Sequence, residues 1–379
     1  MMKENETRAW AEIDLDAIVH NLEMMHEKAK ESGIVAVVKA NAYGNGAVEI
    51  AKYIEDIPYV HGFAVATADE AFELRDNGIK KPIMLLGLIH PSLYDKAIKN
   101  AAEIVIVSLD QARELSDEAS RLGKDALVQI AVDTGMNRIG NKVDEAFADE
   151  IKEISSLKNI IIKGIFTHFY LSDAEDKSNA KEQLDLFLDM MDMLDKRSIN
   201  IPFKHCSNSA AILEFPDAHM DLVRAGIAMY GLYPSFEVFD KELDPVMSLY
   251  ARVTHIKKVH EGESISYGAT FTADRDMTVA TIGIGYGDGY PRQLSNKGSV
   301  LINGKRCKIL GRVCMDQFMV DISDAGEVNL WDEAVLIGPF GIEIITMEEL
   351  GGLSGRFNYE LSCMISNRVP RVYIKNGKK

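Results

Sequence analysis

One lysine stands where a charged side chain is costly to bury. Lys39 follows the apolar run IVAVV, residues 34–38. This run is typical of a strand buried on both faces, because it lacks the polar alternation of a one-sided strand. An ammonium group there is unfavourable unless it is paired, acts as a base with a lowered pKa, or forms an imine. Imine chemistry suggests pyridoxal phosphate as a cofactor.

Other polar side chains also stand at or just after the ends of apolar runs. Taken singly, each is more often an ordinary polar residue of a loop or strand end. If the runs are parallel strands of a barrel, however, their carboxyl ends meet at one rim, where barrel enzymes hold their active sites. The shared position therefore predicts one site, formed with Lys39 by Asp133, Arg138, His168, His205, Asn208, Ser209 and Arg224.

A phosphate group would need its own cradle, and barrels often provide one after the seventh and eighth strands. The segments 207–211 and 225–231 occupy those places. Ser209 can donate a hydroxyl there, and Gly226 and Ile227 can offer backbone amides.

The elements that must position these residues alternate regularly. Short apolar runs and amphipathic stretches follow one another from Asp14 onward, which is the pattern of βα units with a parallel sheet. A first helix is expected from Asp14 to Gly33, and capping boxes are expected at Thr67 and Ser108. We predict an α/β fold with a (β/α)8 TIM barrel whose strands lie at 34–39, 61–66, 82–87, 104–107, 127–133, 161–168, 203–207 and 221–226.

Beyond residue 239 the pattern changes to long β-rich runs with glycine turns and one short helical candidate at 347–350. We predict a cofactor-binding barrel over residues 12–239 and a mostly β C-terminal domain over residues 240–379. The N-terminal segment 1–11 is expected to pack with the β domain.

The composition argues against several classes of function. A net charge of −16 disfavours a nucleic-acid partner, which needs clustered Lys and Arg. The chain has neither an apolar run of membrane-spanning length nor the apolar segment of a signal peptide at its start, so we expect a cytoplasmic protein. Its nine histidines and four cysteines show no metal-ligand spacing, and no metal site is expected.

Several motifs in the sequence resemble those of a known enzyme family. The segment AVVKANAYGNG (36–46) resembles the cofactor-lysine motif of alanine racemases, which depend on pyridoxal phosphate. The similarity continues in the same order over nearly the whole chain, through 133–140, 167–169, 208–211, 224–232, 266–271, 285–290 and 314–317.

The resemblance implies a role for each matching residue. Lys39 would hold the cofactor as an internal aldimine, and Arg224 would face its pyridine nitrogen. His168 would flank the ring, and Arg138 would contact the phenolic oxygen. The phosphate would be bound by Tyr43, Ser209, Gly226, Ile227 and Tyr359.

The resemblance further implies a two-base racemisation between L-alanine and D-alanine. Lys39 would serve one face of the substrate Cα. Tyr267 would serve the other, supplied by the partner subunit of a homodimer with composite sites. Its ordinary pKa near 10 is high for this task, and a His168–Arg224 network is our candidate for easing its ionisation. The substrate would also meet Arg138, Met315 and Asp316.

One position departs from the family pattern. Many relatives carry a carbamylated lysine seven residues before the arginine that matches Arg138, and this chain has Ala131 there. Arg138 must then find another anion, such as chloride or a nearby carboxylate.

Other functions remain open. The chain could be a racemase that prefers serine or another small amino acid. A decarboxylase of the same architecture is disfavoured by Arg224, because such enzymes generally place a carboxylate at the ring nitrogen. A non-catalytic cofactor-binding protein is a further alternative, disfavoured by the β domain with Tyr267 and Met315. The main expectation is an alanine racemase, an isomerase that would supply D-alanine for peptidoglycan.

Overall fold

The structure is a computed structural model that describes residues 7–378 except 236 and 239–241. The chain forms two compact units. The barrel unit comprises residues 19–42 and 46–244, and the β unit comprises residues 1–18, 43–45 and 245–379. The predicted division between residues 239 and 240 lies outside the described residues.

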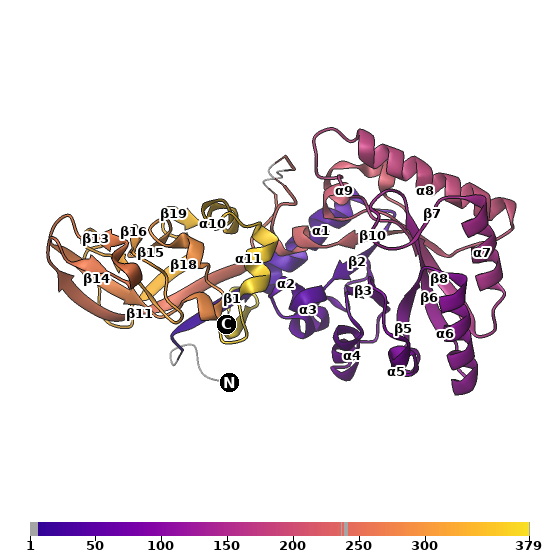
Figure 1. Ribbon diagram of the computed structural model, residues 1–379, viewed down its shortest axis with the longest axis horizontal. Coiled ribbons are helices and arrows are strands. Elements are labelled where there is room, and N and C mark those ends of the chain that lie inside the picture. Colours follow the sequence, from indigo (N-terminus) through magenta and orange to yellow (C-terminus); the bar gives the residue numbers. More distant parts are fainter. Residues whose placement is uncertain (1–6, 236, 239–241, 379) are drawn as a thin grey trace. The chain divides into compact units, whose positions relative to one another are not determined.

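The barrel unit confirms the predicted parallel barrel (Figure 1). Its eight strands pair in the order β10-β2-β3-β4-β5-β6-β8-β9. The Arg224 amide donates to the carbonyl of Ser207 at 3.0 Å, which links the last two strands and nearly closes the ring. The strands are β2 (Gly33–Val37), β3 (Val60–Val65), β4 (Ile83–Leu85), β5 (Ala102–Ile106), β6 (Ala126–Asp133), β8 (Ile160–Phe166), β9 (Phe203–His205) and β10 (Leu222–Ala225).

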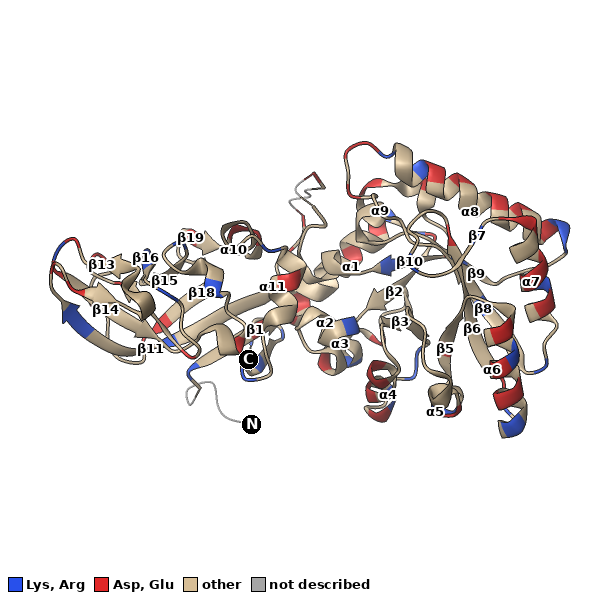
Figure 2. Cartoon of the chain, viewed as in Figure 1, with Lys and Arg blue, Asp and Glu red and all other residues tan. Residues whose placement is uncertain are grey.

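Helices surround these strands (Figure 1). Bands of Asp and Glu run along α4, α6, α7 and α8, whereas the strands are mostly uncharged (Figure 2). This contrast is expected when strands are covered by amphipathic helices, whose outer faces are exposed to solvent. The helices are α1 (Leu15–Lys28), α3 (Ala47–Ile54), α4 (Ala68–Asp76), α5 (Tyr94–Lys99), α6 (Leu109–Leu122), α7 (Glu145–Ser155), α8 (Ser178–Lys196) and α9 (Ser209–Glu214).

The structure confirms the predicted helix ends only in part. The capping box of Thr67 and Glu70 is present at α4. At α6, Ser108 accepts from the Gln111 amide as predicted, but the Gln111 side chain accepts from the Val107 amide instead of closing the box. The first helix ends at Lys28, before the expected stop at Gly33.

The β unit is built on a mixed sheet in the order β19-β18-β15-β16-β17-β14-β11-β1-β20. Strand β1 pairs antiparallel with β11 and parallel with β20, so both ends of the chain join this sheet. Its strands are β1 (Ala9–Asp14), β11 (Met247–Val259), β14 (Met277–Ile282), β15 (Ser299–Ile302), β16 (Lys305–Leu310), β17 (Phe318–Asp321), β18 (Glu333–Phe340), β19 (Glu343–Ile345) and β20 (Arg371–Ile374).

The expectation of a single short helix in this unit was wrong. Two helices, α10 (Met347–Ser354) and α11 (Asn358–Met364), follow each other. The pair Gly351 and Gly352 lies inside α10, and such residues weaken any helical signal in the sequence.

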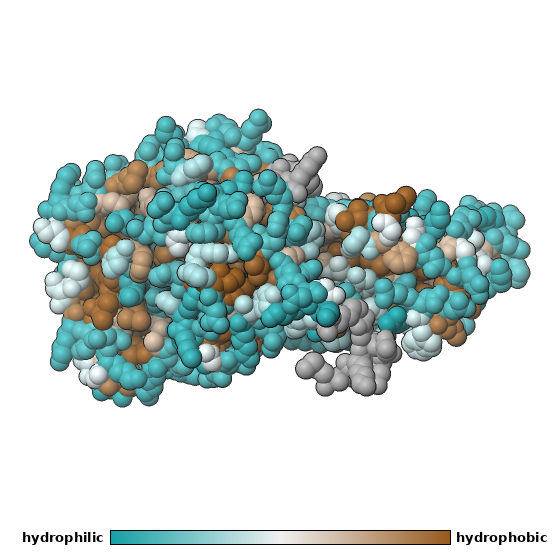
Figure 3. All heavy atoms as spheres, turned by 180° about the vertical axis from the view of Figure 1, so that it is seen from behind, coloured by the Kyte–Doolittle hydropathy of each residue, from teal (hydrophilic) through white to brown (hydrophobic). Residues whose placement is uncertain are grey.

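Polar side chains cover much of the visible surface. On the face shown in Figure 3, hydrophilic side chains surround scattered apolar areas. Within the described part of the chain, no helix has the length and apolar character needed to cross a bilayer. No group of His, Cys, Asp and Glu that could hold a metal ion occurs among the described residues.

Candidate active site

A left-handed turn follows Lys39. Strand β2 ends at Val37, two residues earlier than expected, and the backbone of residues 40–43 then takes φ values of 52 to 54°. Each such residue costs about 1–2 kcal/mol in a left-handed helix, so the turn must be held from outside. The Ala40 amide donates to the Glu70 carboxylate at 2.6 Å, and the Asn41 side chain accepts from the Ala47 amide at 2.9 Å.

A cavity of about 130 Å³ brings four of the predicted basic residues of the barrel unit together, with Asp133 as a fifth predicted residue in its lining. Lys39, Arg138, His168 and Arg224 all line it. Three of these side chains are cationic groups, and Asp133 is the one carboxylate among the described residues that line the cavity. Such a pocket attracts anionic groups.

Arg224 is the most constrained of the four. It is 3% exposed, and its terminal nitrogens donate to the carbonyls of Thr167, His205 and Cys206 at 2.9 to 3.0 Å. They also meet Nδ1 of His205 at 2.8 Å and Nδ1 of His168 at 3.1 Å. Its Nε has no hydrogen-bond partner among the described residues, although the side chain lines the cavity.

These contacts fix the histidine tautomers. A guanidinium can only donate, so each Nδ1 accepts and the ring proton sits on Nε2. Burial, followed by the charge of Arg224, lowers the pKa of His168 and of His205 well below the ordinary value. Both rings are therefore neutral at neutral pH. Burial lowers the pKa of Arg224 itself to about 10, so it stays charged.

His205 was expected at the rim, and the structure corrects this. It belongs to β9 and is fully buried, stacked on Phe166 with ring centroids 5.3 Å apart. His205 therefore supports Arg224 from the barrel core and does not line the cavity.

The predicted phosphate cradle forms a compact turn. The Ser209 hydroxyl oxygen accepts from the Gly226 amide at 3.0 Å, and Ile227 begins the short helix η4 (Ile227–Tyr230). Asn208 caps α9 by accepting from the Ala211 amide at 3.1 Å. A hydroxyl and the first amides of a helical turn thus gather after β9 and β10, and the Gly226 amide is already bonded to the Ser209 oxygen.

The loop that carries Arg138 is organised by Asp133. One carboxylate oxygen of Asp133 accepts from the amides of Gly135 and Asn137 at 3.0 and 2.9 Å. Arg138 is exposed, and it has neither an ion pair nor a hydrogen bond with any described residue. Ala131 lines the same cavity and supplies no charged group there.

The β unit brings the two predicted phosphate tyrosines together. The rings of Tyr43 and Tyr359 meet edge to face with centroids 6.2 Å apart. The Ser362 hydroxyl on α11 donates to the Tyr43 carbonyl, and Arg371 donates to the Gly44 carbonyl at 2.9 Å. Burial, and less so the charge of Cys363, raises the pKa of Tyr43, which therefore keeps its proton as a hydrogen-bond donor.

The remaining predicted residues of the β unit lie on exposed loops. Tyr267 is 71% exposed and starts the short helix η5 (Tyr267–Ala269), and Met315 is 52% exposed. The Ser266 hydroxyl donates to the Arg312 carbonyl at 2.7 Å, which fixes the start of the Tyr267 loop. Both large side chains are therefore accessible to another molecule.

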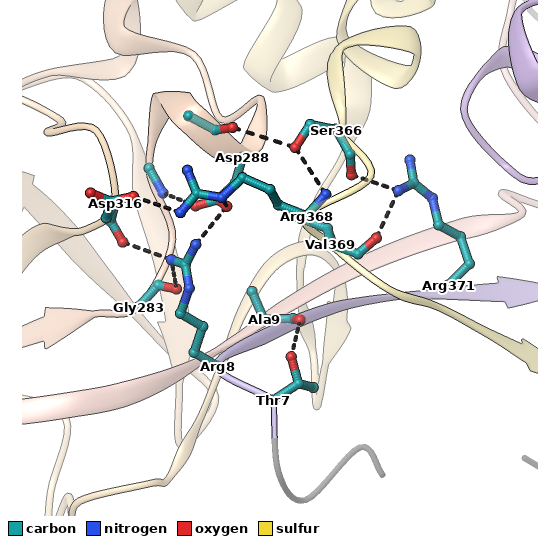
Figure 4. Close-up of polar contacts among 12 residues, drawn as sticks. Thr7, Arg8, Ala9, Gly283, Asp288, Asp316, Ser366, Arg368, Val369 and Arg371 are labelled. Atoms are coloured by element: carbon teal, nitrogen blue, oxygen red, sulfur yellow. Dashed lines mark hydrogen bonds and ion pairs between the residues drawn. The ribbon is translucent and has the colours of Figure 1, made fainter. Parts of the chain in front are cut away.

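An ion cluster around the buried Asp288, which the sequence did not reveal, contacts Asp316 next to Met315 (Figure 4). Asp288 is fully buried and pairs with Arg8 at 2.6 Å and with Arg368 at 3.3 Å. Arg368 also pairs with Asp316 at 2.6 Å, and Arg8 donates to the Asp316 carbonyl at 2.8 Å. Its members are separated by up to hundreds of residues, so no local pattern could have predicted the cluster.

We expect Asp288→Asn to destabilise the protein by about 2 kcal/mol, because the substitution leaves two arginines facing a neutral side chain. The measurement is urea-induced unfolding. Asp274→Asn is the control, since Asp274 is 78% exposed and its ion pair with Arg275 lies at the surface; its effect should stay below about 0.5 kcal/mol. Equal shifts for both variants would contradict a structural role for the cluster.

Comparisons with known proteins agree on one family. A family model described as the alanine racemase N-terminal domain matches residues 13–234, and the corresponding C-terminal domain model matches residues 246–373. Alanine racemase 1 of Clostridium acetobutylicum is 45% identical, covering 97% of this chain and 96% of that protein.

Solved structures give the same picture. Alanine racemase of Clostridium difficile 630 superposes with a TM-score of 0.94 at 40% identity, covering 98% of this chain and 97% of that one. A histidine racemase of Leuconostoc mesenteroides subsp. sake superposes with a TM-score of 0.91 at 30% identity, covering 97% and 98%. Similar architecture is thus found in racemases named for different amino acids.

Proposed function

Because this chain belongs to the alanine racemase family, a family of isomerases, we propose that it interconverts L-alanine and D-alanine with pyridoxal 5'-phosphate as cofactor. The observation that carries the proposal is the cavity where Lys39, Arg138, His168 and Arg224 meet. We also propose the role expected for such an enzyme in a bacterium, which is to supply D-alanine for peptidoglycan from the cytoplasm.

The residues present fit this cofactor. The Nε of Arg224, which has no partner among the described residues, can donate to a ring nitrogen. The pocket of cationic groups suits a phosphorylated ligand. The bound group would delocalise the electrons that remain on the substrate Cα when its proton leaves. The residues that would hold it are Lys39, Tyr43, Arg138, His168, Ser209, Arg224, Gly226, Ile227 and Tyr359.

The chain's own groups would then perform distinct tasks. Lys39 would anchor the cofactor and exchange a proton with one face of Cα. Arg224, charged at neutral pH, would keep the ring nitrogen as an acceptor without a proton, which limits side reactions. Tyr267 would exchange a proton at the opposite face, since inversion is most simply achieved by two groups on opposite faces.

We propose a homodimer in which Tyr267, Met315 and Asp316 of one subunit complete the site of the other. Support comes from the exposure of Tyr267 and Met315, which burial in an interface would explain. The ion cluster around Asp288 would then set the position of the Met315 loop for the partner's substrate.

The identity of the amino acid needs its own experiment. Purified protein loaded with cofactor should racemise alanine with a higher kcat/KM than serine or histidine. Faster turnover of serine would support the alternative of a racemase for another small amino acid. Bound cofactor with no turnover of any amino acid would favour the binding-protein alternative.

Arg138 leads to a prediction about anions. It adds positive charge to a cavity that already holds Lys39 and Arg224, and Ala131 supplies no compensating group. We expect kcat/KM to rise when chloride replaces gluconate at constant ionic strength, because a small anion can neutralise the guanidinium. Ala131→Asp should remove this dependence by supplying a carboxylate. An activity that ignores chloride in both proteins would contradict an anion beside Arg138.

A further inference from the structure

A buried polar chain continues from Arg224 into the core of the barrel. Nε2 of His205 lies 3.2 Å from Oε1 of Gln129 on β6, and Nε2 of Gln129 donates to the carboxylate of Glu103 on β5 at 2.7 Å. Glu103, Gln129 and His205 are 3, 1 and 0% exposed. Neither Glu103 nor Gln129 lines the cavity, and neither has a task in the proposed reaction.

The hydrogen bonds of this buried polar chain can run in only one direction. A carboxylate only accepts, so the Gln129 amide must present its NH2 group to Glu103 and its oxygen to His205. That oxygen requires the proton of His205 to sit on Nε2. Nδ1 is then left as the acceptor that Arg224 needs.

The surrounding backbone is shaped around this amide. A Cβ added at Gly164 on β8 would lie 2.4 Å from Oε1 of Gln129 and 2.8 Å from the carbonyl oxygen of Phe203. Any side chain at residue 164 would therefore displace Gln129. The absence of a side chain keeps the strand close enough for the amide to bridge Glu103 and His205.

The energetics indicate a purpose other than stability. Burying a carboxylate and a guanidinium in one core is often no better than packing apolar residues of the same volume. Burial raises the pKa of Glu103, opposed by the hydrogen bond from Gln129 and by the positive charges of Lys163 and Arg75. Buried polar networks that are fully satisfied do, however, hold one arrangement of their members.

We propose that Glu103 and Gln129 are positioning residues that fix the tautomer of His205 and thereby hold Arg224 in one hydrogen-bonded position. The inference deepens the proposed function and rests on it, because Arg224 matters for catalysis only if it faces the cofactor.

The test compares Glu103→Gln with the double variant Glu103→Gln/Gln129→Glu. The single variant removes the acceptor-only group, so the amides at 103 and 129 can both turn and His205 can take either tautomer. The double variant moves the carboxylate from residue 103 to residue 129, where it accepts directly from Nε2 of His205. Glu73→Gln on the exposed side of α4 is the control.

The primary readout is the ¹⁵N spectrum of the histidine side chains in the cofactor-loaded protein, with the His205 signals identified by their loss in His205→Gln. We expect Nε2–H in the wild type, the control and the double variant, and a mixture of tautomers in Glu103→Gln. The kcat of Glu103→Gln should fall by on the order of 10- to 100-fold with little change in KM, and the double variant should recover most of it.

An unchanged His205 tautomer in Glu103→Gln would overturn the inference, as would a double variant that does not restore it. If Glu103→Gln does not fold, a folded double variant with Nε2–H at His205 supports the proposal, and an unfolded one overturns it. The spectra can be read without turnover. A wild-type protein that does not racemise would therefore contradict the proposed function without touching this inference. An active protein whose His205 tautomer is unchanged in Glu103→Gln would contradict this inference alone.

Discussion

Replacing Lys39 by alanine is expected to reduce racemisation by at least about 10⁴-fold, because one substitution removes both the anchor of the cofactor and one of the two bases. The side chain lines the cavity with Arg138, His168 and Arg224, and no other lysine among the described residues does so. Visible absorbance of the purified variant would report the loss of covalently held cofactor.

The control for this prediction is Lys158→Ala, which removes an exposed lysine on the loop before β8. It should retain both cofactor and activity. A Lys39→Ala protein that still racemises alanine at a rate near that of the control would remove Lys39 from the mechanism.

Replacing Tyr267 by phenylalanine is expected to leave cofactor binding intact and to slow racemisation in both directions by about 10²- to 10⁴-fold, the usual contribution of one acid–base group. The rate falls in both directions because each direction needs a proton donor on one face of Cα and an acceptor on the other. Tyr59→Phe, just before β3, is a matched loss of a hydroxyl in the barrel unit and should be neutral. Activity that survives Tyr267→Phe would exclude the phenol as the second base.

The two variants together test the composite site. In a dimer with one Lys39→Ala subunit and one Tyr267→Phe subunit, one site has both native bases and the other has neither. Random assortment of the two inactive proteins should therefore restore about a quarter of the wild-type activity. Mixtures that stay inactive after subunit exchange would show that both bases come from the same chain.

Some of this site could be predicted from local patterns. Lys39 was identified because a lysine directly after a doubly buried strand is rare without a reason. The barrel was predicted because eight apolar runs repeat with a regular spacing, and its parallel order then placed Arg138, His168 and Arg224 near one rim. All three side chains line one cavity in the structure.

Other features could not be predicted because they depend on distant contacts. Glu103 and Gln129 are single polar residues in apolar runs, which signalled burial but not a partner. The ion pair of Arg8 with Asp288 joins positions 280 residues apart. The left-handed turn after Lys39 contains Ala40 and Ala42, which have no intrinsic preference for that conformation and adopt it because Glu70 and neighbouring groups hold the turn.

The most direct test of the central claim is the fate of pure D-alanine incubated in D₂O with the purified, cofactor-loaded protein. We predict that L-alanine appears until both enantiomers are present in equal amounts, and that the product carries deuterium at Cα because the proton is exchanged with the catalytic bases. The same end point should be reached from L-alanine. Protein that binds the cofactor but releases no L-alanine from D-alanine would contradict the account.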